Sequence, residues 1–538
     1  MTRTLIIGVA AIVLVGSPVP AAQAQPAAPT PQVTITGFID TVMSVHRNDQ
    51  DSLMGRSGDS EWYARNRGRF DVIGQLGRAK AVLGIEIDSI WGTTALTGGD
   101  NNLAAGGTAA QRNGSTSAFD LNTDTQGSME VKWLYTEFPL PFMPFPTVVR
   151  LGAQPFAVMY KSTTYARDEF AGLNIDMNFT PNLKAHFTYA QIEENLTGSR
   201  RALGFGRGDD FAIVTSVEVT PIRGLDIRPL YSYVQLVGST SGSARVPVGG
   251  IGGTPAFTRS AIGGVGGLGL YEGRHTIGVD ARWRSGPFSL EPTLLYQFGS
   301  RDTDNPFVGP GAGNAVTSAD ISAFLFDVIG GWRLGPLFLE ARYMYSSGNR
   351  PKDQLSRDVN YFQPLNLDSG YWGAGWGEIL SLGIDYFTGC IRAQCQSIGL
   401  DRYGRQQFAV RATYTVIPQL DIRAVVSPEW TAKAVDTDGV TAFANGGNAA
   451  AAITCATHTA NSAANPQGAG CDGDSSYVGT EVNLGLTWRF APGLAFDLVG
   501  AVLFTGSALD TSEVLNGVLT KREAKNAYKI ATRIRYTF

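Results

Sequence analysis

The sequence predicts an all-β fold: a closed antiparallel transmembrane β-barrel of about 18 strands. From Val33 to the C-terminus, apolar or aromatic residues alternate with polar ones at a period of two, which is typical of strands with one apolar and one wet face. Short turns alternate with mostly long loops, as in a barrel whose two ends differ. One strand of a soluble sandwich shows the same alternation, but a sandwich would not repeat it along most of the chain. A closed sheet suits lipid because every backbone polar group finds a partner within it.

The composition excludes several classes of protein. The chain has 538 residues, of which 17% are charged, whereas an ordinary soluble chain has about 25%. After residue 16, no apolar run approaches the roughly 18 to 20 residues that a membrane-spanning helix needs, so a polytopic helical membrane protein is excluded. The formal net charge is -4 and no Lys/Arg-rich run occurs, so we expect no nucleic-acid partner.

The N-terminus predicts export from the cytoplasm. Arg3 precedes a short apolar stretch over residues 5–15, and a small-residue cleavage site of the Ala-x-Ala type follows. Together these features predict that residues 1–24 are a cleaved secretory signal peptide. Residues 25–32 then form a Pro/Ala-rich lead-in, and residues 33–538 form the barrel.

The four cysteines form two closely spaced pairs, Cys390 with Cys395 and Cys455 with Cys471. In an exported protein this spacing predicts two local disulfides. Metal binding is the alternative, but no histidine stands at ligand spacing around either pair, so we expect no metal site and no cofactor.

Eighteen segments of about 10 to 13 residues carry the alternation. They are residues 33–45, 61–74, 79–91, 128–138, 147–158, 169–179, 184–194, 210–219, 225–237, 273–284, 288–299, 320–333, 337–346, 407–417, 420–430, 477–490, 494–506 and 524–538. If both ends of the chain are periplasmic, the strand number is even, and eighteen strands need nine outer loops and eight inner turns.

Residues 377–389 could form one further strand, but a nineteenth strand would break this parity. We therefore assign residues 347–406 to one long outer loop, with a short helix near residues 376–387. We expect this loop to fold into or over the lumen.

Aromatic residues cluster near the strand ends on the face predicted to meet lipid. Tyr and Trp prefer the headgroup level, where their apolar rings and polar tips are both accommodated. The predicted outward aromatics are Trp133, Tyr135, Tyr231, Tyr233, Trp283, Trp332, Tyr343, Tyr345, Trp488 and Phe538.

Charges of both signs are predicted on the opposite face. Buried unpaired charge is costly, so such a lining implies that water fills the interior. The pore-lining residues that we expect are Arg65, Arg67, Arg69, Glu86, Asp88, Arg150, Asp176, Arg228, Arg282, Arg411, Arg423, Arg489, Arg533 and Arg535.

Two neighbouring strands allow a prediction of register. A tight turn centred on Leu76 and Gly77 would set Arg67 opposite Glu86 and Arg65 opposite Asp88. Opposed charges across strands stabilise by roughly 0.2 to 1 kcal/mol per pair.

Closure of the barrel sets the last strand beside the first. A basic sector of wall is then expected, and basic side chains favour anions by offsetting their dehydration. The sector would contain Arg65, Arg67, Arg69, Lys529, Arg533 and Arg535. The sequence therefore predicts a mild preference for anionic or polyhydroxylated solutes.

The terminal residues Arg535-Tyr536-Thr537-Phe538, with the leader and the alternating strands, resemble bacterial outer-membrane β-barrel proteins of the porin type. The resemblance implies that Tyr536 and Phe538 belong to the signal read by the barrel-assembly machinery. It also implies an outer-membrane location among lipid and lipopolysaccharide, passive diffusion of small hydrophilic solutes, and in some members a homotrimer. By the same resemblance, residues 347–406 or 159–168 would form an inward constriction.

Two alternatives stay open at this point. A substrate-specific or polysaccharide channel is one, although mixed lumen charges do not favour an acidic polysaccharide. An outer-membrane enzyme is the other, but only His186 of the four histidines is predicted in the lumen, and spacing suggests no Ser/His/Asp grouping. Two acidic runs, residues 436–438 and 472–474, could hold Ca²⁺, yet such runs are more typical of solvated turns.

Overall fold

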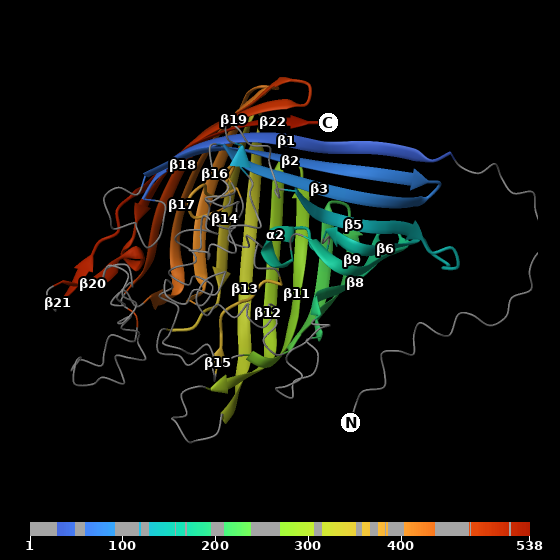
Figure 1. Ribbon diagram of the computed structural model, residues 1–538, viewed down its shortest axis with the longest axis horizontal. Coiled ribbons are helices and arrows are strands. Elements are labelled where there is room, and N and C mark those ends of the chain that lie inside the picture. Colours follow the sequence, from blue (N-terminus) through green and yellow to red (C-terminus); the bar gives the residue numbers. More distant parts are fainter. Residues whose placement is uncertain are drawn as a thin grey trace, which may run out of the picture.

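Eighteen long antiparallel strands form one closed wall in the computed structural model (Figure 1). The structure describes residues 30–48, 60–91, 118–119, 129–155, 158–166, 169–194, 209–237, 269–305, 315–350, 358–365, 375–381, 383–385, 403–435, 473, 475–515 and 518–538. The leader, the four cysteines and the two acidic runs, apart from Gly473 in the second run, lie outside these residues.

Each long strand pairs with its neighbour along the chain. The strands are β1 (Gln32–Arg47), β2 (Ser60–Leu76), β3 (Ala79–Trp91), β5 (Met129–Pro139), β6 (Thr147–Pro155), β7 (Glu169–Thr180), β8 (Leu183–Glu194), β9 (Asp209–Ile222), β10 (Leu225–Val237), β11 (Gly269–Ser285), β12 (Phe288–Asn305), β13 (Ala315–Leu334), β14 (Leu337–Ser346), β16 (Arg405–Ile417), β17 (Leu420–Val435), β18 (Ser475–Ala491), β19 (Leu494–Thr505) and β22 (Ala527–Thr537). All eighteen coincide with the segments predicted from the alternation, so the predicted fold is confirmed.

Six short elements lie in the long connections. They are β4 (Ala118–Phe119), α2 (Ser162–Tyr165), β15 (Asp358–Val359), η9 (Ser507–Leu509), β20 (Thr511–Leu515) and β21 (Val518–Arg522). Strands β20 and β21 form a separate two-stranded sheet between β19 and β22. Within the described ranges, the helices are too short and too polar for any of them to cross a membrane.

The wall closes where β22 meets β1 (Figure 1). Gly37 and Phe538 exchange two backbone hydrogen bonds, each 3.0 Å long, and the ladder continues through Asp40 opposite Arg535. The Phe538 ring lies 5.8 Å from that of Phe70 and 5.7 Å from that of Tyr536, measured between ring centroids. The last residue of the chain therefore contributes to the closing seam through both its backbone and its side chain.

The two faces of the wall differ in the way the alternation predicts. On β22, Tyr528, Ile530 and Ile534 are exposed on the outside, while Lys529 is buried inside. Among the predicted outward aromatics, large exposed areas belong to Tyr231, Trp332, Trp488 and Phe538. A band of rings also runs across β8 to β12, formed by Tyr189, Phe211, Tyr233, His275 and Phe298.

Trp133 and Tyr135 are an exception, because they face the lumen. The register between β3 and β5 shifts at Lys132, where a β-bulge inserts one extra residue and reverses the alternation that follows. The Trp133 indole donates a 2.9 Å hydrogen bond to Asp71, and the Arg150 guanidinium lies 5.1 Å from the Tyr135 ring centroid. The prediction of an outward face for these two residues is wrong.

The seam predicts an effect on assembly. Phe538→Ala removes both aromatic contacts, each worth about 1 kcal/mol, so we expect a lower folded yield in lipid and a loss of about 1 to 2 kcal/mol of stability. The change in electrophoretic mobility on heating measures the folded fraction. Phe504→Ala, which removes an outward ring from β19, serves as the control, and an equal loss in both variants would contradict a special role for the seam.

Candidate functional site

A first inward segment, residues 158–166, runs from the connection between β6 and β7 into the lumen. The backbone N–H groups of Tyr160 and Lys161 donate to Asp280 Oδ2 at 2.6 and 3.3 Å. Lys161 Nζ donates to the Glu291 carbonyl at 2.8 Å and lies 3.1 Å from Asp327 Oδ2. Because Asp280, Glu291 and Asp327 belong to β11, β12 and β13, the segment is fastened across three strands. Burial lowers the pKa of Lys161, and Asp327 and Asp280 oppose that effect.

The tip of this segment lies deep in the barrel. The Tyr160 ring has the guanidinium groups of Arg228 and Arg282 each 4.3 Å from its centroid. Both arginines stand three residues from the short-turn ends of their strands, β10 and β11. The first inward segment therefore reaches from the long-connection end of the barrel into its opposite half.

A second inward segment, residues 358–365, lies in the connection between β14 and β16. It begins as β15, which pairs in parallel with β13. Gln363 exchanges two hydrogen bonds with Gln297, at 2.9 and 2.7 Å. The Leu365 N–H donates to the Tyr165 carbonyl at 2.8 Å, and the Phe362 ring centroid lies 6.2 Å from that of Tyr165. The two inward segments thus support one another.

Both inward segments share an apolar core with the wall. The core joins Met159, Tyr165 and Phe362 to inward residues of β7 to β14 such as Leu295 and Met344, all of them buried. Protein therefore replaces water along this part of the lumen.

A third inward piece, which we call the strap, comprises residues 375–381 and 383–385. The Glu481 carboxylate of β18 accepts hydrogen bonds from three successive N–H groups of the strap: those of Glu378 at 2.5 Å, Ile379 at 2.9 Å and Leu380 at 2.8 Å. The carbonyl groups of Glu378 and Leu380, which a helix would bond to N–H groups four residues further on, accept instead from Lys529 and Arg405. The helix expected near residues 376–387 is accordingly absent from the described residues, which form turns and bends.

Basic wall residues hold the carbonyl groups of the strap. Lys529 Nζ donates to the Glu378 carbonyl at 2.7 Å, Arg405 to the Leu380 carbonyl at 3.1 Å and Arg411 to the Gly375 carbonyl at 3.0 Å. Further along, the Tyr63 hydroxyl of β2 donates to the Asp385 carboxylate. The strap is therefore fastened to the wall between β16 and β2.

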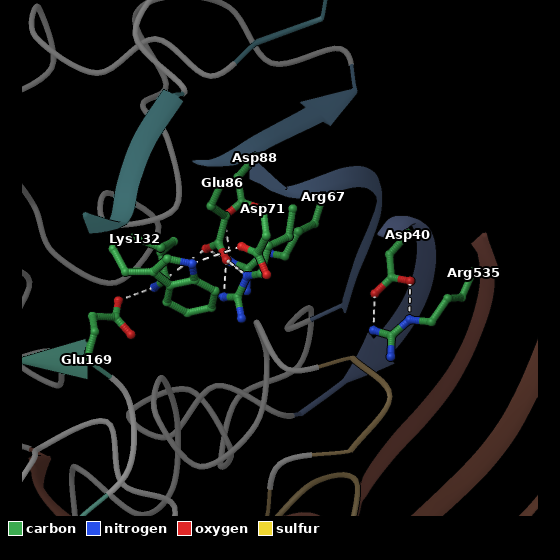
Figure 2. A network of polar contacts seen from close by, with 10 residues as sticks. Asp40, Arg67, Asp71, Glu86, Asp88, Lys132, Glu169 and Arg535 are labelled. Carbon is green, nitrogen blue, oxygen red and sulfur yellow. Dashed lines mark hydrogen bonds and ion pairs between the residues drawn. The ribbon is translucent and has the colours of Figure 1, made fainter. Parts of the chain in front are cut away.

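A polar network lines the wall beside the strap, on β22, β1, β2, β3, β5 and β7 (Figure 2). It has two parts. In the first, Arg67 binds Asp88 through both carboxylate oxygens, at 2.6 and 2.5 Å, and Arg69 binds Glu86. In the second, Arg535 binds Asp40 across the seam (Figure 2).

Lys132 extends the first part of the network to a further strand. Its ammonium lies 2.6 Å from the Glu169 carboxylate of β7 and 3.9 Å from that of Glu86 (Figure 2). Glu86 thus has three basic partners within 4.0 Å: Arg67, Arg69 and Lys132.

Basic groups are the more exposed partners in most of these ion pairs. The Arg69 side chain is 27% exposed against 3% for Glu86, and that of Arg535 is 32% exposed against 0% for Asp40. Arg423 and Glu378 show the same difference, at 32% and 2%. The charge exposed to water in the lumen is therefore mainly positive, because in most pairs the carboxylate is the more buried partner.

The residues predicted to line the pore lie all around the wall and do not gather in one cluster. Arg65 is buried in the wall. The other residues form ion pairs. The pairs are Arg67 with Asp88, Arg69 with Glu86, Arg150 with Glu137, Asp176 with His186, Arg228 with Glu218, Arg282 with Asp226, Arg411 with Glu340, Arg423 with Glu378, Arg489 with Asp421, Arg533 with Asp497, and Arg535 with Asp40.

The predicted register of β2 against β3 is wrong by two residues. Arg67 stands opposite Asp88, and Arg69 opposite Glu86. The turn consists of Gly77 and Arg78, closed by Leu76 opposite Ala79, because Gly77 adopts a positive φ of 59° that a two-residue hairpin turn requires.

Acidic residues also interrupt the expected basic sector. Asp40 lies between Arg535 and Arg67 in the register, and Asp497 binds Arg533 at 2.8 Å. The sector is thus a set of ion pairs, and its positive character comes from the greater exposure of the bases.

Sequence reasoning missed Tyr160, Lys161, Asp327 and Glu378. Asp327 carried a usable signal, because it is the only charged residue in the apolar stretch from residue 321 to residue 329. Tyr160, Lys161 and Glu378 lie in loops, whose positions depend on contacts with distant strands.

A Ser/His/Asp alignment that spacing did not suggest is present on the lumen wall. Asp176, His186 and Ser216 stand opposite one another on β7, β8 and β9, and His186 Nδ1 lies 2.6 Å from Asp176 Oδ1. Within the described part of the chain, His186 Nε2 and Ser216 Oγ are both buried without a hydrogen-bond partner. The serine hydroxyl is neither accessible nor bonded to the histidine, so the alignment does not favour an enzyme.

No protein-family model matches the sequence, and no curated protein matches it either. Solved structures similar to this one include OpdL of Pseudomonas aeruginosa, with 10% sequence identity and a TM-score of 0.47. OccK8 (OprE) of the same organism has 11% identity and a TM-score of 0.45, and OccAB4 of Acinetobacter baumannii has 11% identity and a TM-score of 0.44. Each match covers 94% of this chain and 98% of the other.

The anchoring of the first inward segment predicts a large effect at Asp327. Asp327→Asn leaves the buried cations Lys161 and Arg342 without their charged partner, so we expect a loss of about 3 to 5 kcal/mol in the free energy of unfolding. Urea denaturation in lipid vesicles measures the change.

Asp421→Asn is the matched control, because its partner Arg489 is half-exposed. We expect this variant to lose less than about 1 kcal/mol. Equal losses in the two variants would contradict a buried anchor at Asp327.

Proposed function

We propose that the protein is an outer-membrane channel through which small hydrophilic solutes diffuse passively. One observation carries the proposal: a closed 18-stranded wall is apolar outside and lined inside by charged groups, several of which remain exposed to solvent. Barrels of 16 to 18 strands are wide enough to leave an aqueous channel. Holding these charges in an interior without water would cost a large free energy, so we infer that water fills the lumen around them.

The proposed orientation puts the short turns in the periplasm and the long connections outside the cell. Short periplasmic turns and long outer loops are the rule for such barrels. The predicted leader supports export, and the porin resemblance of the terminal strand supports recognition of Tyr536 and Phe538 by the barrel-assembly machinery. The surrounding partners would be outer-membrane lipid and lipopolysaccharide. A homotrimer rests on the resemblance alone.

A mild preference for anions is the finer part of the proposal. Glu86 and Asp40 are almost fully buried, whereas the side chains of their partners Arg69 and Arg535 are 27% and 32% exposed. Basic side chains at a pore wall lower the cost of dehydrating an anion. The difference in exposure between paired acids and bases therefore supports anion selectivity better than the number of arginines does.

A substrate-specific channel is the second candidate. The two inward segments and the strap occupy part of the lumen and are fastened by buried polar contacts. A lumen narrowed by fixed protein favours solutes of a particular size and shape over general diffusion.

Reconstitution tests the channel itself. The purified protein in a planar bilayer should give ion currents in discrete steps, and liposomes that contain it should swell in isosmotic solutions of small sugars but not of large ones. A protein that folds in lipid, as judged by gel mobility, yet carries no current would contradict the proposal.

Anion preference predicts a loss of selectivity in Arg69→Gln. One unit charge about 4 Å from an ion is worth about 1 kcal/mol in water, so we expect the anion-to-cation permeability ratio to fall about threefold to fivefold. Glu86 keeps Arg67 as a partner at 3.1 Å, so the wall should stay intact. Reversal potentials in a salt gradient measure the ratio.

The control is Arg284→Gln, which removes the same charge from β11 at the short-turn end of the barrel. We expect this change to have little effect on selectivity. The same fall in both variants would show that selectivity follows total charge and not the network of Figure 2.

A further inference from the structure

We propose that Trp133 is a stacking platform on the lumen wall, which binds the apolar face of a pyranose sugar as the solute passes. The proposal rests on the channel function proposed above and adds a binding site to it.

The β-bulge at Lys132 brings this indole into the lumen. Without the extra residue, the alternation along β5 would point Trp133 toward lipid, as the sequence predicts. The side chain is half-buried, so part of the ring meets the water of the lumen. Covering that part with an apolar surface of a solute is therefore favourable.

The indole lies flat against the wall. A Cβ atom on Gly84, the residue opposite on β3, would lie 2.1 Å from Trp133 Nε1 and 2.4 and 2.5 Å from the two carbons bonded to it. A point beyond the ring edge would be much closer to the nitrogen than to both carbons, so these similar distances place the ring face over the glycine. One face of the indole is thus covered by β3, and the other face is turned toward the lumen.

Two neighbours fix the ring in this position. Asp71 Oδ1 on β2 accepts the indole N–H at 2.9 Å. The Arg69 guanidinium lies 5.4 Å from the Trp133 ring centroid and 5.8 Å from that of Phe38 on β1, so it stands between two lumen rings. A ring held in this way loses little conformational entropy when a ligand covers it.

Polar groups of both signs lie beside the platform. Arg69 and Lys132 supply hydrogen-bond donors. Asp71 and Glu169 supply acceptors (Figure 2). A sugar hydroxyl both donates and accepts, so it can bond to groups of either kind. The C–H groups on one face of a pyranose meanwhile meet the electron-rich face of the indole.

An aromatic acid fits this platform less well. Its ring can stack on the indole, but its carboxylate only accepts hydrogen bonds and is repelled by Asp71 and Glu169. A pyranose is therefore the ligand class that the groups around Trp133 favour.

Titration of the ion current in a planar bilayer tests the platform. Glucose supplies a pyranose ring, whereas sorbitol supplies a six-carbon chain of hydroxyl groups without a ring. Aromatic stacking strengthens binding by about threefold to tenfold. We therefore expect glucose to reduce the current at a concentration about threefold to tenfold below that of sorbitol.

Four variants locate the effect. Trp133→Ala should abolish the preference for glucose, and Trp133→Phe, which keeps a smaller ring, should preserve part of it. Gly84→Ala keeps the indole but displaces it, so this variant should also lose the preference. The matched control is Trp332→Ala, which removes an indole from the outer face of β13 and should leave the preference unchanged. Gel mobility on heating checks that each variant is folded.

Saturation-transfer NMR gives a second readout that needs no current. Irradiation of the folded protein in detergent micelles should transfer magnetisation to the ring protons of glucose more strongly than to sorbitol. In Trp133→Ala, the signal of glucose should fall to that of sorbitol.

Equal effects of glucose and sorbitol on the unmodified protein, or a preference that survives Trp133→Ala, would overturn the platform and leave the channel intact. Benzoate that acts at a lower concentration than glucose, and loses this effect in Trp133→Ala, would overturn the assignment to sugars. Folded protein that passes no current yet binds glucose through Trp133 would overturn the channel function and support the platform. Folded protein that does neither would overturn both.

Discussion

Lipid offers the peptide backbone no hydrogen-bond partner, and this constraint shapes the whole wall. Each of the eighteen strands finds its partners in two neighbours, and the seam between β1 and β22 leaves no edge. Closure also separates the side chains into two sets, because successive residues of a strand point to opposite faces. Apolar rings meet lipid on one face, and charges are enclosed on the other.

Those enclosed charges then organise the interior. Acids and bases on adjacent strands pair across the wall, as Arg67 does with Asp88 and Arg535 with Asp40. Other wall charges bind backbone: Asp280 holds the first inward segment, and Glu481 holds the strap. The same residue types therefore stiffen the wall in one sector and fasten loops in another, and the difference lies in what stands opposite each charge.

The strands were predictable from sequence because alternation is a local property that repeats eighteen times. Register was not predictable to the residue, since the turn at Gly77 depends on a backbone angle that composition alone does not reveal. A single bulge at Lys132 likewise reversed the expected faces of Trp133 and Tyr135. The ion-pair partners of the predicted lumen charges, such as Asp226 for Arg282, required the three-dimensional register. The strap depends on Glu481, about a hundred residues further along the chain, and no local pattern indicates such a contact.

Cysteine accessibility along β22 tests the central claim most directly. Single cysteines at Ile530, Ile534, Arg533 and Arg535 would be placed in protein reconstituted into vesicles, then exposed separately to a lipid-dissolved and a water-soluble thiol reagent. A sealed cylinder with oil outside and water inside predicts strict alternation: the two isoleucine positions react from lipid, and the two arginine positions react from water. Equal reaction of neighbouring positions with the same reagent would contradict the account.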